Sequence, residues 1–290
     1  MIVHKTLFII NPKAGKKKKL DITNFIKTNF KSYNEFEIVV WENKDEFEKI
    51  IEYIFSNHFT IAVAVGGDGT VNKVASAVVN TSVALGILPM GSGNGLARSL
   101  DVSMNLKKAL STIAAAKISK IDSGIINGKN FFCTAGVGFD AHIGNLFATS
   151  TKRGLQSYIK IICREFFNYK SKSYQINYAN TKINEEAFLI TFANAGQYGN
   201  DFYIAPQADL KDGELTMCIL KPFSIFRLAS ILVKVLRRTT MKSKYFNYSN
   251  GTTFKITSKE KIIFHFDGEP GNEMDEIEVK IVPLSLHVVC

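Results

Sequence analysis

Apolar and polar positions follow two different rhythms along the chain. Up to about residue 120, short runs rich in β-branched residues alternate with segments that carry apolar residues at helical spacing. The β-runs are Thr6–Ile10, Glu37–Trp41, Thr60–Val65 and Ala84–Leu88. The helical patterns are Lys19–Lys31, Asp45–His58, Thr70–Val79 and Leu106–Ala115. This alternation predicts an α/β fold with a parallel sheet flanked by helices.

From about Ile121 onward, the pattern changes to β-runs joined by turn residues. These runs are Phe131–Thr134, Tyr174–Tyr178, Ala187–Ala193, Leu215–Leu220, Phe254–Thr257, Lys261–Phe266 and Ile277–Val282. Two helical segments, Ala141–Asn168 and Ser224–Arg238, interrupt them. A chain of 290 residues also exceeds the size of most single domains. We therefore predict an α/β domain over residues 1–122 and a mostly β domain over residues 123–290.

Composition narrows the compartment and the kind of partner. The net charge of +10 indicates an anionic partner: nucleotide phosphates, nucleic acid or an acidic membrane. No apolar run approaches the roughly 20 residues that span a bilayer, and the N-terminus lacks the features of a secretory signal. The four cysteines form no CxxC pair, and the five histidines show no HExxH spacing. We expect a soluble, cytoplasmic protein without a disulfide framework or a zinc site, and no histidine in a catalytic role.

Three of the four N-terminal β-runs are followed at once by a glycine-bearing turn and then by a helical pattern. The turns are Asn11–Gly15, Gly66–Thr70 and Gly91–Asn94. Since parallel strands end at one edge of their sheet, the three turns are expected to gather there beside helix N-termini. Glycine lets the backbone approach a phosphate, whose charge unpaired N–H groups stabilise. Any one turn could be a simple tight connection, but three together predict a phosphate-binding site.

Asp68 places a carboxylate among the backbone donors of the second turn. A carboxylate beside bound phosphates suggests a Mg²⁺ ion, which neutralises charge in phosphoryl transfer. Thr70 and Asn72 could add polar contacts. The dinucleotide fingerprint fails because Leu96 stands in place of its third glycine, and the P-loop and protein-kinase motifs are absent.

Six segments extend this evidence over nearly the whole chain. They are NPKAG at 11–15, GGDGT at 66–70, LPMGSGNGLAR at 88–98, GVGFDA at 136–141, ADLKDGEL at 208–215 and FDGE at 266–269. In this order they resemble the diacylglycerol kinase catalytic-domain family, which includes bacterial lipid kinases and sphingosine kinases. The resemblance implies an ATP-dependent lipid kinase with a nucleotide-binding α/β domain and a β-sandwich-like lipid-substrate domain, with ATP in the cleft between them.

The resemblance also implies roles for single residues. Glu269 matches the general base proposed for bacterial members, and Asp68 matches the residue given that role in sphingosine kinases. Asp209, Asp212 and Glu214 match positions that hold a structural Mg²⁺ in bacterial members. For two of the three positions, the alternative is that only the backbone carbonyl, and not the side chain, binds the ion. The nucleotide-binding residues we expect are Asn11, Gly66, Gly67, Asp68, Gly69, Thr70, Val71, Asn72, Gly91, Ser92, Gly93, Asn94, Arg153 and Asp267.

Two positions depart from the pattern of bacterial diacylglycerol kinases. Gly95 replaces the aspartate of their GTxNDFA segment, which makes this chain more similar to sphingosine and ceramide kinases. Trp41 replaces a threonine that contacts nucleotide. Its indole could stack beside adenine or pack in the core.

Several of these residues also have an ordinary structural explanation. Asp267-Gly268 is a common turn sequence, and only the family match raises Glu269 above it. Arg153 could reach ATP phosphates or remain a solvated charge. Asp140 matches a segment near the lipid head group in the family, but an acidic residue before a helix is also a common cap.

The segment from Phe223 to Arg238 carries apolar residues at i, i+3 and i+4, with basic residues in and after it. The apolar positions are Ile225, Leu228, Ala229, Leu232, Val235 and Leu236, widened by Phe226 and Ile231. The basic residues are Arg227, Lys234, Arg237, Arg238, Lys242 and Lys244. This combination predicts a helix that lies on an anionic membrane, while its innermost face packs on the protein. The run Lys16–Lys19 is either a solvated helix start, a phosphate-attracting rim or a lipid-facing patch.

These observations predict transfer of the γ-phosphate of ATP to a hydroxyl of a diacylglycerol- or sphingoid-type lipid, with ATP and Mg²⁺ as cofactors. The expected partners are the lipid substrate and the anionic inner membrane surface, where the protein is peripheral; a homodimer is left open. Nucleic acid is not expected because no binding motif is present. The alternatives are an NAD kinase, which shares GGDGT, and a nucleotide-binding regulator without transfer activity.

Overall fold

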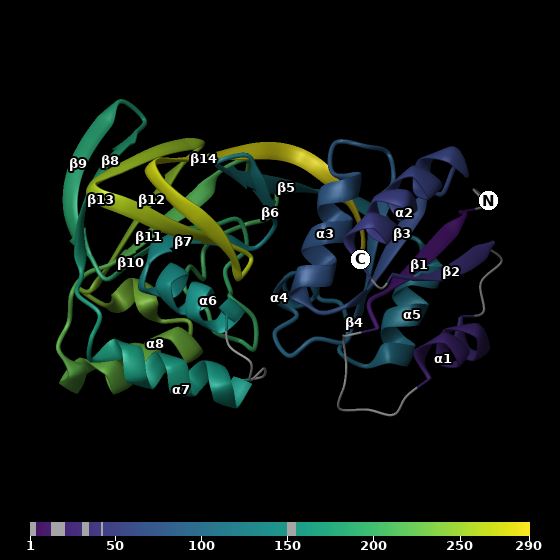
Figure 1. Cartoon of the computed structure of the whole chain (residues 1–290), viewed down its shortest axis with the longest axis horizontal. Helices are drawn as coiled ribbons and strands as arrows, with labels where there is room; N and C mark the ends of the chain where they lie inside the picture. Colours follow the sequence, from purple (N-terminus) through teal and green to yellow (C-terminus); the bar gives the residue numbers. More distant parts are fainter. Residues whose placement is uncertain (1–3, 13–20, 31–34, 42, 150–154) are drawn as a thin grey trace. The chain divides into compact units, whose positions relative to one another are not determined.

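The computed structural model describes residues 4–12, 21–30, 35–41, 43–149 and 155–290. The chain forms two compact units (Figure 1). Unit 1 comprises Met1–Ile121 and Leu284–Cys290, and unit 2 comprises Asp122–Pro283. Within the ranges given above, no helix is long and apolar enough to cross a membrane.

Unit 1 is built on a parallel sheet. Its strands are β1 (Thr6–Ile10), β2 (Phe36–Val40), β3 (Ile61–Gly66) and β4 (Ala84–Pro89), in the spatial order β4-β3-β1-β2. The end of the long strand β14 (Glu269–Val289) joins this sheet beside β4. Every residue of β1, β3 and β4 is buried. Their continuous apolar runs are typical of parallel strands covered on both faces.

The helices of unit 1 are α1 (Ile22–Asn29), α2 (Lys44–Ser56), α3 (Asp68–Val78), α4 (Gly95–Ser99) and α5 (Leu106–Ala115). The side chains of Asp21, Asn43 and Asn105 cap the N-termini of α1, α2 and α5 by accepting backbone N–H bonds. In contrast, α3 begins after Gly67, and within the described part of the chain no side chain caps it. The first N–H groups of α3 therefore lack the side-chain acceptor that α1, α2 and α5 have.

Unit 2 is largely antiparallel. The spatial order of its main strands is β12-β11-β10-β7-β13-β14, with β7 (Thr134–Gly138), β10 (Leu189–Ala193), β11 (Leu215–Leu220), β12 (Phe246–Gly251) and β13 (Thr253–Phe266). The hairpin of β8 (Lys172–Tyr178) and β9 (Thr181–Ala187) extends from β13. β5 (Ile118–Ile126) pairs with β6 (Lys129–Phe131) and with β14. The strands enclose an aliphatic and aromatic core that includes Phe131, Phe192 and Phe254.

Three helices of unit 2 lie together on one side of these strands (Figure 1). They are α6 (Phe139–Thr149), α7 (Leu155–Phe166) and α8 (Leu228–Leu236). Short 3₁₀ turns, Ile225–Arg227 and Thr240–Lys242, flank α8. A second apolar cluster joins the helices to the strands; it includes Ile143 from α6 and Ile231 from α8, and the partly buried Phe166 from α7 packs against it. This helical layer supplies the outer surface discussed below.

The predicted fold class, a parallel α/β domain followed by a mostly β domain, is confirmed. Some element boundaries were wrong. Phe131–Thr134 is not one strand, because β6 ends at Phe131 and β7 begins at Thr134. Ala141–Asn168 contains two helices, and the runs Phe254–Thr257 and Lys261–Phe266 belong to the single strand β13. The helix α4, the strands β5, β9 and β12 and the 3₁₀ turn Thr240–Lys242 were not predicted at all.

Candidate active site

The glycine-bearing turns lie side by side at the carboxyl ends of β1, β3 and β4. The backbone N–H of Asn11 donates to the carbonyl of Val65 at 3.2 Å, and that of Met90 donates to the carbonyl of Gly66 at 2.8 Å. The side-chain Nδ2 of Asn11 donates to the hydroxyl of Thr70 at 3.0 Å. The predicted convergence of the turns is thus confirmed for Asn11 and for the second and third turns. Residues 13–15 of the first turn and the Lys16–Lys19 run lie outside the described residues.

The second and third turns meet backbone against backbone. A Cβ atom added to Gly67 would lie 3.0 Å from the Cα of Gly91, and one added to Gly91 would lie 2.6 Å from the Cα of Gly67. A Cβ on Gly91 would also lie 2.7 Å from Oδ1 of Asn94. Glycine is therefore required at both positions by close approach of two chain segments, not only by turn conformation.

Asp68 joins the second turn to the third. Its Oδ2 accepts the backbone N–H of Asn94 at 2.9 Å, and its Oδ1 accepts the backbone N–H of Gly95 at 2.6 Å. Because Gly95 is the first residue of α4, the carboxylate caps that short helix from another part of the chain. Both carboxylate oxygens are thus engaged in holding the third turn.

The third turn is also braced from within. Asn94 adopts a left-handed conformation with φ 53°, its Oδ1 accepts the N–H of Gly91 at 2.9 Å, and its Nδ2 donates to the carbonyl of Gly91 at 3.0 Å. Nε of Arg98 donates to the carbonyl of Gly93 at 3.1 Å. Ser92 is exposed at the tip of the turn. The hydrogen bonds therefore hold the backbone of the turn in place, and the side chain of Ser92 is exposed on it.

Three of the predicted nucleotide-binding residues in α3 have buried side chains. Thr70, Val71 and Asn72 are 4%, 5% and 6% exposed. The residues before them, Gly67, Asp68 and Gly69, are partly exposed. Any ligand at this turn would therefore meet backbone groups at the start of α3 rather than the side chains further along the helix.

Trp41 lies in the interior of unit 1. It is 7% exposed, its ring makes an edge contact with Phe47 at 4.6 Å between centroids, and the Nζ of Lys73 lies 5.1 Å from its centroid. Burial and these two contacts favour the packing role over stacking beside adenine. The departure from the family threonine is thus accommodated by the core.

Glu269 stands at the start of β14, directly after a tight hairpin. Phe266 and Glu269 are paired across the turn, and Asp267 and Gly268 between them have φ values of 47° and 81°. Two central residues with positive φ are typical of a two-residue type I′ hairpin, for which Asp-Gly is a favoured sequence. The hairpin holds the exposed side chain of Glu269 at the end of a rigid ribbon.

The carboxylate of Asp267 binds three consecutive backbone N–H groups. Oδ2 accepts from Phe132 at 2.9 Å, and Oδ1 accepts from Cys133 at 2.8 Å and from Thr134 at 3.1 Å. The backbone N–H of Asp267 donates to the carbonyl of Thr134 at 2.8 Å, which closes the connection. Asp267 therefore fixes the hairpin to the start of β7. Its predicted contact with nucleotide stays a prediction.

We expect Asp267→Ala to lower the unfolding free energy of the protein by about 3 kcal/mol, because three backbone donors lose their acceptor at a cost of about 1 kcal/mol or more each. Urea unfolding followed by circular dichroism measures this change. The matched control is Asp275→Ala, which removes an exposed aspartate from the same strand, β14. Equal stability of the two variants would show that the three bonds contribute nothing.

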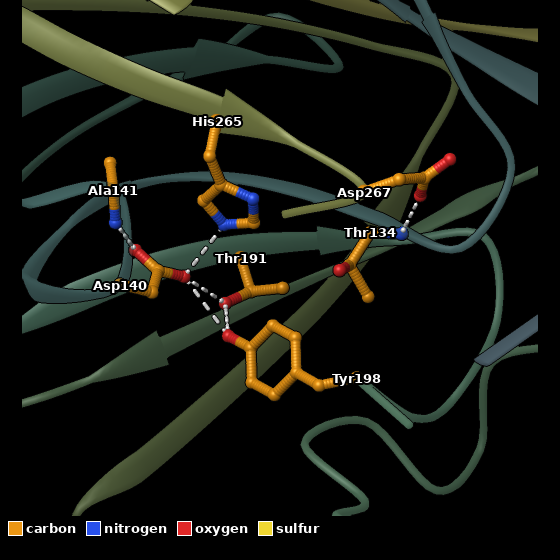
Figure 2. A network of polar contacts seen from close by, with 7 residues as sticks. All are labelled: Thr134, Asp140, Ala141, Thr191, Tyr198, His265 and Asp267. Carbon is orange, nitrogen blue, oxygen red and sulfur yellow. Dashed lines mark hydrogen bonds and ion pairs between the residues drawn. The ribbon is translucent and has the colours of Figure 1, made fainter. Parts of the chain in front are cut away.

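A second polar network surrounds Asp140 at the start of α6 (Figure 2). Oδ2 of Asp140 accepts from the hydroxyls of Thr191 at 3.2 Å and Tyr198 at 3.0 Å, and it lies 3.1 Å from Nε2 of His265. Oδ1 accepts the N–H of Ala141 at 2.8 Å. The side chains of His265 and Asp140 are only 4% and 11% exposed. Asp140 is thus the centre of a buried network and more than a helix cap.

Tyr198 remains a protonated donor to Asp140. Burial, together with the charge of Asp140, raises the pKa of Tyr198 well above its ordinary value. Gly136 makes room for the network, since a Cβ there would lie 3.0 Å from Oδ2 of Asp140 and 3.1 Å from Nε2 of His265. The arrangement holds a carboxylate in one orientation inside unit 2.

The residues predicted to hold Mg²⁺ lie in the loop before β11. Oδ1 of Asp209 accepts the N–H of Lys211 at 3.0 Å, and Oδ1 of Asp212 accepts the N–H of Glu214 at 3.0 Å. Burial raises the pKa of Asp212, and the nearby charges of Asp209, Glu214 and Asp122 raise it further. Excess negative charge and oxygen donors suit Mg²⁺. Over the described ranges, however, no three His, Cys, Asp or Glu side chains are arranged to hold a metal, so the ion would need backbone carbonyls.

Sequence reasoning missed the partners of these carboxylates. Asp122 is fully buried, and its Oδ2 accepts the N–H of Gly213 at 2.8 Å, which ties β5 to the predicted magnesium loop. His265, which has no motif spacing, stands in the sequence two residues before Asp267 and contacts Asp140 far away in sequence. Arg153 lies outside the described residues, and its predicted contact with ATP phosphates stays a prediction.

Comparison with known proteins identifies two family models in the chain. Residues 5–126 match the diacylglycerol kinase catalytic domain, and residues 133–290 match the YegS C-terminal NAD kinase beta sandwich-like domain. A Klebsiella pneumoniae protein named "Probable lipid kinase YegS-like" is 30% identical over 80% of this chain and 78% of its own length. A Bacillus subtilis protein named "Diacylglycerol kinase" is 27% identical over 73% of this chain and 72% of its own length.

Two solved structures show the same fold. A diacylglycerol kinase from Bacillus anthracis matches with a TM-score of 0.73 at 17% identity, covering 99% of this chain and 96% of its own. An NAD kinase from Archaeoglobus fulgidus, crystallised with ATP, matches with a TM-score of 0.55 at 12% identity, covering 99% and 93%. With both family models matched in order and relatives named as lipid kinases, this chain belongs to the diacylglycerol kinase catalytic-domain family of lipid kinases.

Proposed function

We propose that this protein binds ATP at the glycine-bearing turns of unit 1 and transfers its γ-phosphate to the hydroxyl of a diacylglycerol- or sphingoid-type lipid at a membrane surface. The observation that carries the proposal is the N-terminus of α3, which has no side-chain cap among the residues that the structure describes. It belongs to the second glycine-bearing turn, which contacts the third turn through Gly67 and Gly91. The family membership adds the acceptor class, because its named relatives are lipid and diacylglycerol kinases.

The phosphates of ATP are proposed to lie at the start of α3. The N–H groups of Asp68 and Gly69, the first two residues of the helix, have no intrahelical acceptors, and the helix dipole is positive at that end. The absence of side chains at Gly67 and Gly91 leaves the backbone accessible, and the exposed hydroxyl of Ser92 adds a donor. A phosphate bound there would take the place of the side-chain cap that α1, α2 and α5 possess.

In the proposed reaction, Glu269 takes the proton from the lipid hydroxyl. The hydroxyl oxygen forms a bond to the γ-phosphorus, while the bond between that phosphorus and the β,γ-bridging oxygen breaks and ADP leaves. An exposed carboxylate on a rigid hairpin suits this role, because its position is set by the turn and by the three N–H bonds to Asp267. Mg²⁺ bound with ATP would neutralise phosphate charge.

Asp68 is proposed as a positioning residue for nucleotide binding. Its carboxylate already accepts the N–H groups of Asn94 and Gly95, so its main effect is to hold the third turn against the second. A contribution to Mg²⁺ would use the lone pairs left on the same oxygens. The assignment of Asp68 as the base is the competing hypothesis.

Membrane association is proposed to use the outer face of α8. Ile231 and Val235 are 4% and 7% exposed and pack inward. Other apolar side chains of this segment face outward, among them Ile225, Phe226, Leu232, Val233 and Leu236, with Phe226 90% exposed. Exposed basic residues accompany them: Arg227, Arg237, Arg238, Lys242 and Lys244. An outward apolar stripe rimmed by positive charge suits an anionic bilayer, and we propose a peripheral location at the inner membrane surface.

We expect the double variant Arg237→Gln, Lys242→Gln to bind anionic vesicles about 30-fold more weakly, since each basic residue near such a surface contributes about 1 kcal/mol. Arg238 is left unchanged because its guanidinium lies over the ring of Tyr203 at 3.8 Å. Vesicle sedimentation at low and high salt measures the effect, and the wild-type protein should bind neutral vesicles poorly.

The charge-matched control removes two exposed lysines from strands of unit 2, in Lys182→Gln, Lys280→Gln. This control should bind like the wild type. An equal loss in both double variants would assign the interaction to net charge alone and contradict a docking role for α8.

The proposed function is tested with labelled ATP and purified diacylglycerol, monoacylglycerol, sphingoid base, ceramide and phosphatidylglycerol in mixed micelles. At least one of these lipids should gain the label in the presence of Mg²⁺. NAD is included as a water-soluble acceptor, because the NAD kinase fold is shared. Labelling of NAD with no labelling of lipid would reject the proposal in favour of the NAD kinase alternative.

A further inference from the structure

Unit 2 contains a cavity of about 570 Å³ that none of the preceding assignments uses. Its walls come from α6, from the end of α7, from the segment that leads into β8 and from β13 around Lys261. The volume lies within the range of small-molecule sites, about 300–1,000 Å³. The cavity is large enough for a lipid head group.

Positive charge exceeds negative charge in the lining. Nζ of Lys172 pairs with Oε2 of Glu260 at 2.7 Å, and Nε2 of His142 lies 3.0 Å from Oε2 of Glu165. Lys170 and Lys261 also line the cavity and are exposed, and neither has an ion-pair partner within the described part of the chain. Both acidic side chains are therefore already paired, and two ammonium groups remain for an anionic ligand.

The rest of the lining is aromatic and aliphatic. Tyr169, Tyr174, Ile262 and Ile263 contribute to it. Burial raises the pKa of Tyr174 to about 12, so its hydroxyl stays neutral. Phe167 stands in the sequence between the lining residues Glu165 and Asn168, and it is 73% exposed. The exposed ring of Phe167 can therefore contact an apolar part of a ligand whose anionic part is bound by the lysines of the cavity.

We infer that this cavity binds the phosphate of an anionic phospholipid, as a site separate from the glycine turns. Lys170 and Lys261 hold the phosphate, and the acyl chains leave the cavity over Phe167. The lipid here is a membrane ligand of unit 2 and not the phosphoryl acceptor. This inference goes beyond the proposed kinase reaction, and it explains why two lysines beside a cavity lack acidic partners.

The test uses calorimetry with the full chain in the absence of ATP. The probe is dihexanoylphosphatidylserine below its micelle concentration; it carries no hydroxyl group and so is not a phosphoryl acceptor. We expect binding by the wild type, and about tenfold or greater loss of affinity in Lys170→Gln, Lys261→Gln, since neutral hydrogen bonds are about half as strong as the charge-assisted ones that they replace. The variant Lys182→Gln, Lys280→Gln has the same net charge and should retain wild-type affinity.

Three further measurements separate this inference from its competitors. Inorganic phosphate should bind more weakly than the lipid, and Phe167→Ser should weaken lipid binding without changing phosphate binding. Equal affinity for phosphate and lipid would assign the cavity to free phosphate and overturn the lipid part. No binding by the wild type, or equal affinities of the two double-lysine variants, would overturn the site. ATP affinity should be the same in all these variants, so failure here is distinguishable from failure of the nucleotide site.

Discussion

Glu269→Gln should lower turnover about a hundred- to ten-thousand-fold, the usual contribution of a positioned base, and leave ATP affinity nearly unchanged. Glutamine keeps the shape of the side chain but does not accept the hydroxyl proton. The hairpin itself should persist, because the type I′ turn depends on Asp267 and Gly268 and Glu269 is exposed. Steady-state kinetics with a lipid acceptor, combined with calorimetric ATP binding, measures both quantities.

Asp68→Asn is the companion variant and should differ in kind. Asparagine offers one acceptor oxygen in place of two, so either the Asn94 or the Gly95 N–H loses its partner and faces an amide NH₂ group. The third turn should loosen, and ATP affinity and turnover should fall together. Should Glu269→Gln retain full activity while Asp68→Asn loses turnover at unchanged ATP affinity, the base is Asp68.

Gly67→Val should reduce ATP affinity about a hundredfold or more, because phosphate contacts depend on backbone N–H groups that the displaced turn no longer presents. A Cβ at Gly67 would already lie 3.0 Å from the Cα of Gly91, and valine adds two methyl groups beyond it. Gly91→Ala should be more damaging than Gly67→Ala, since its Cβ would lie 2.6 Å from backbone. Calorimetric titration with Mg-ATP gives the affinities.

The control for this series is Gly144→Ala in α6, where an added Cβ would make only ordinary contacts at 3.8 and 3.9 Å. It should bind ATP like the wild type. A folded Gly67→Val protein with unchanged ATP affinity would place the nucleotide elsewhere.

The fold of unit 1 was largely predictable, because the strands of a buried parallel sheet read as continuous apolar runs and their turns carry glycine. The strands that were not predicted in the second half of the chain have sequences that lack a typical strand pattern, and the reason is physical. Residues 181–187, TKINEEA, are rich in Lys, Asn and Glu, which are uncommon in strands, and form β9 through their pairing with β8. The five-residue helix α4 is too short for a periodic pattern, and it is capped by Asp68 from 27 residues away in sequence.

The candidate site was predictable only where local chemistry decides it. The glycine turns and the Asp267-Gly268 turn follow from residue type. The other roles depend on partners remote in sequence: Asp267 binds N–H groups at residues 132–134, and Asp140 contacts His265 across 125 positions. A motif reveals that a carboxylate is present, whereas the donors that occupy its oxygens are set by tertiary structure.

The central claim is that the γ-phosphate of ATP is transferred to a lipid hydroxyl, and product analysis tests it most directly. The protein is incubated with γ-labelled Mg-ATP and a total bacterial lipid extract, and mass spectrometry identifies the labelled product. We predict a lipid phosphate monoester that appears with the wild type and is lost with Gly67→Val. Label found only in inorganic phosphate or in a water-soluble nucleotide, with none in the lipid fraction, would contradict the account.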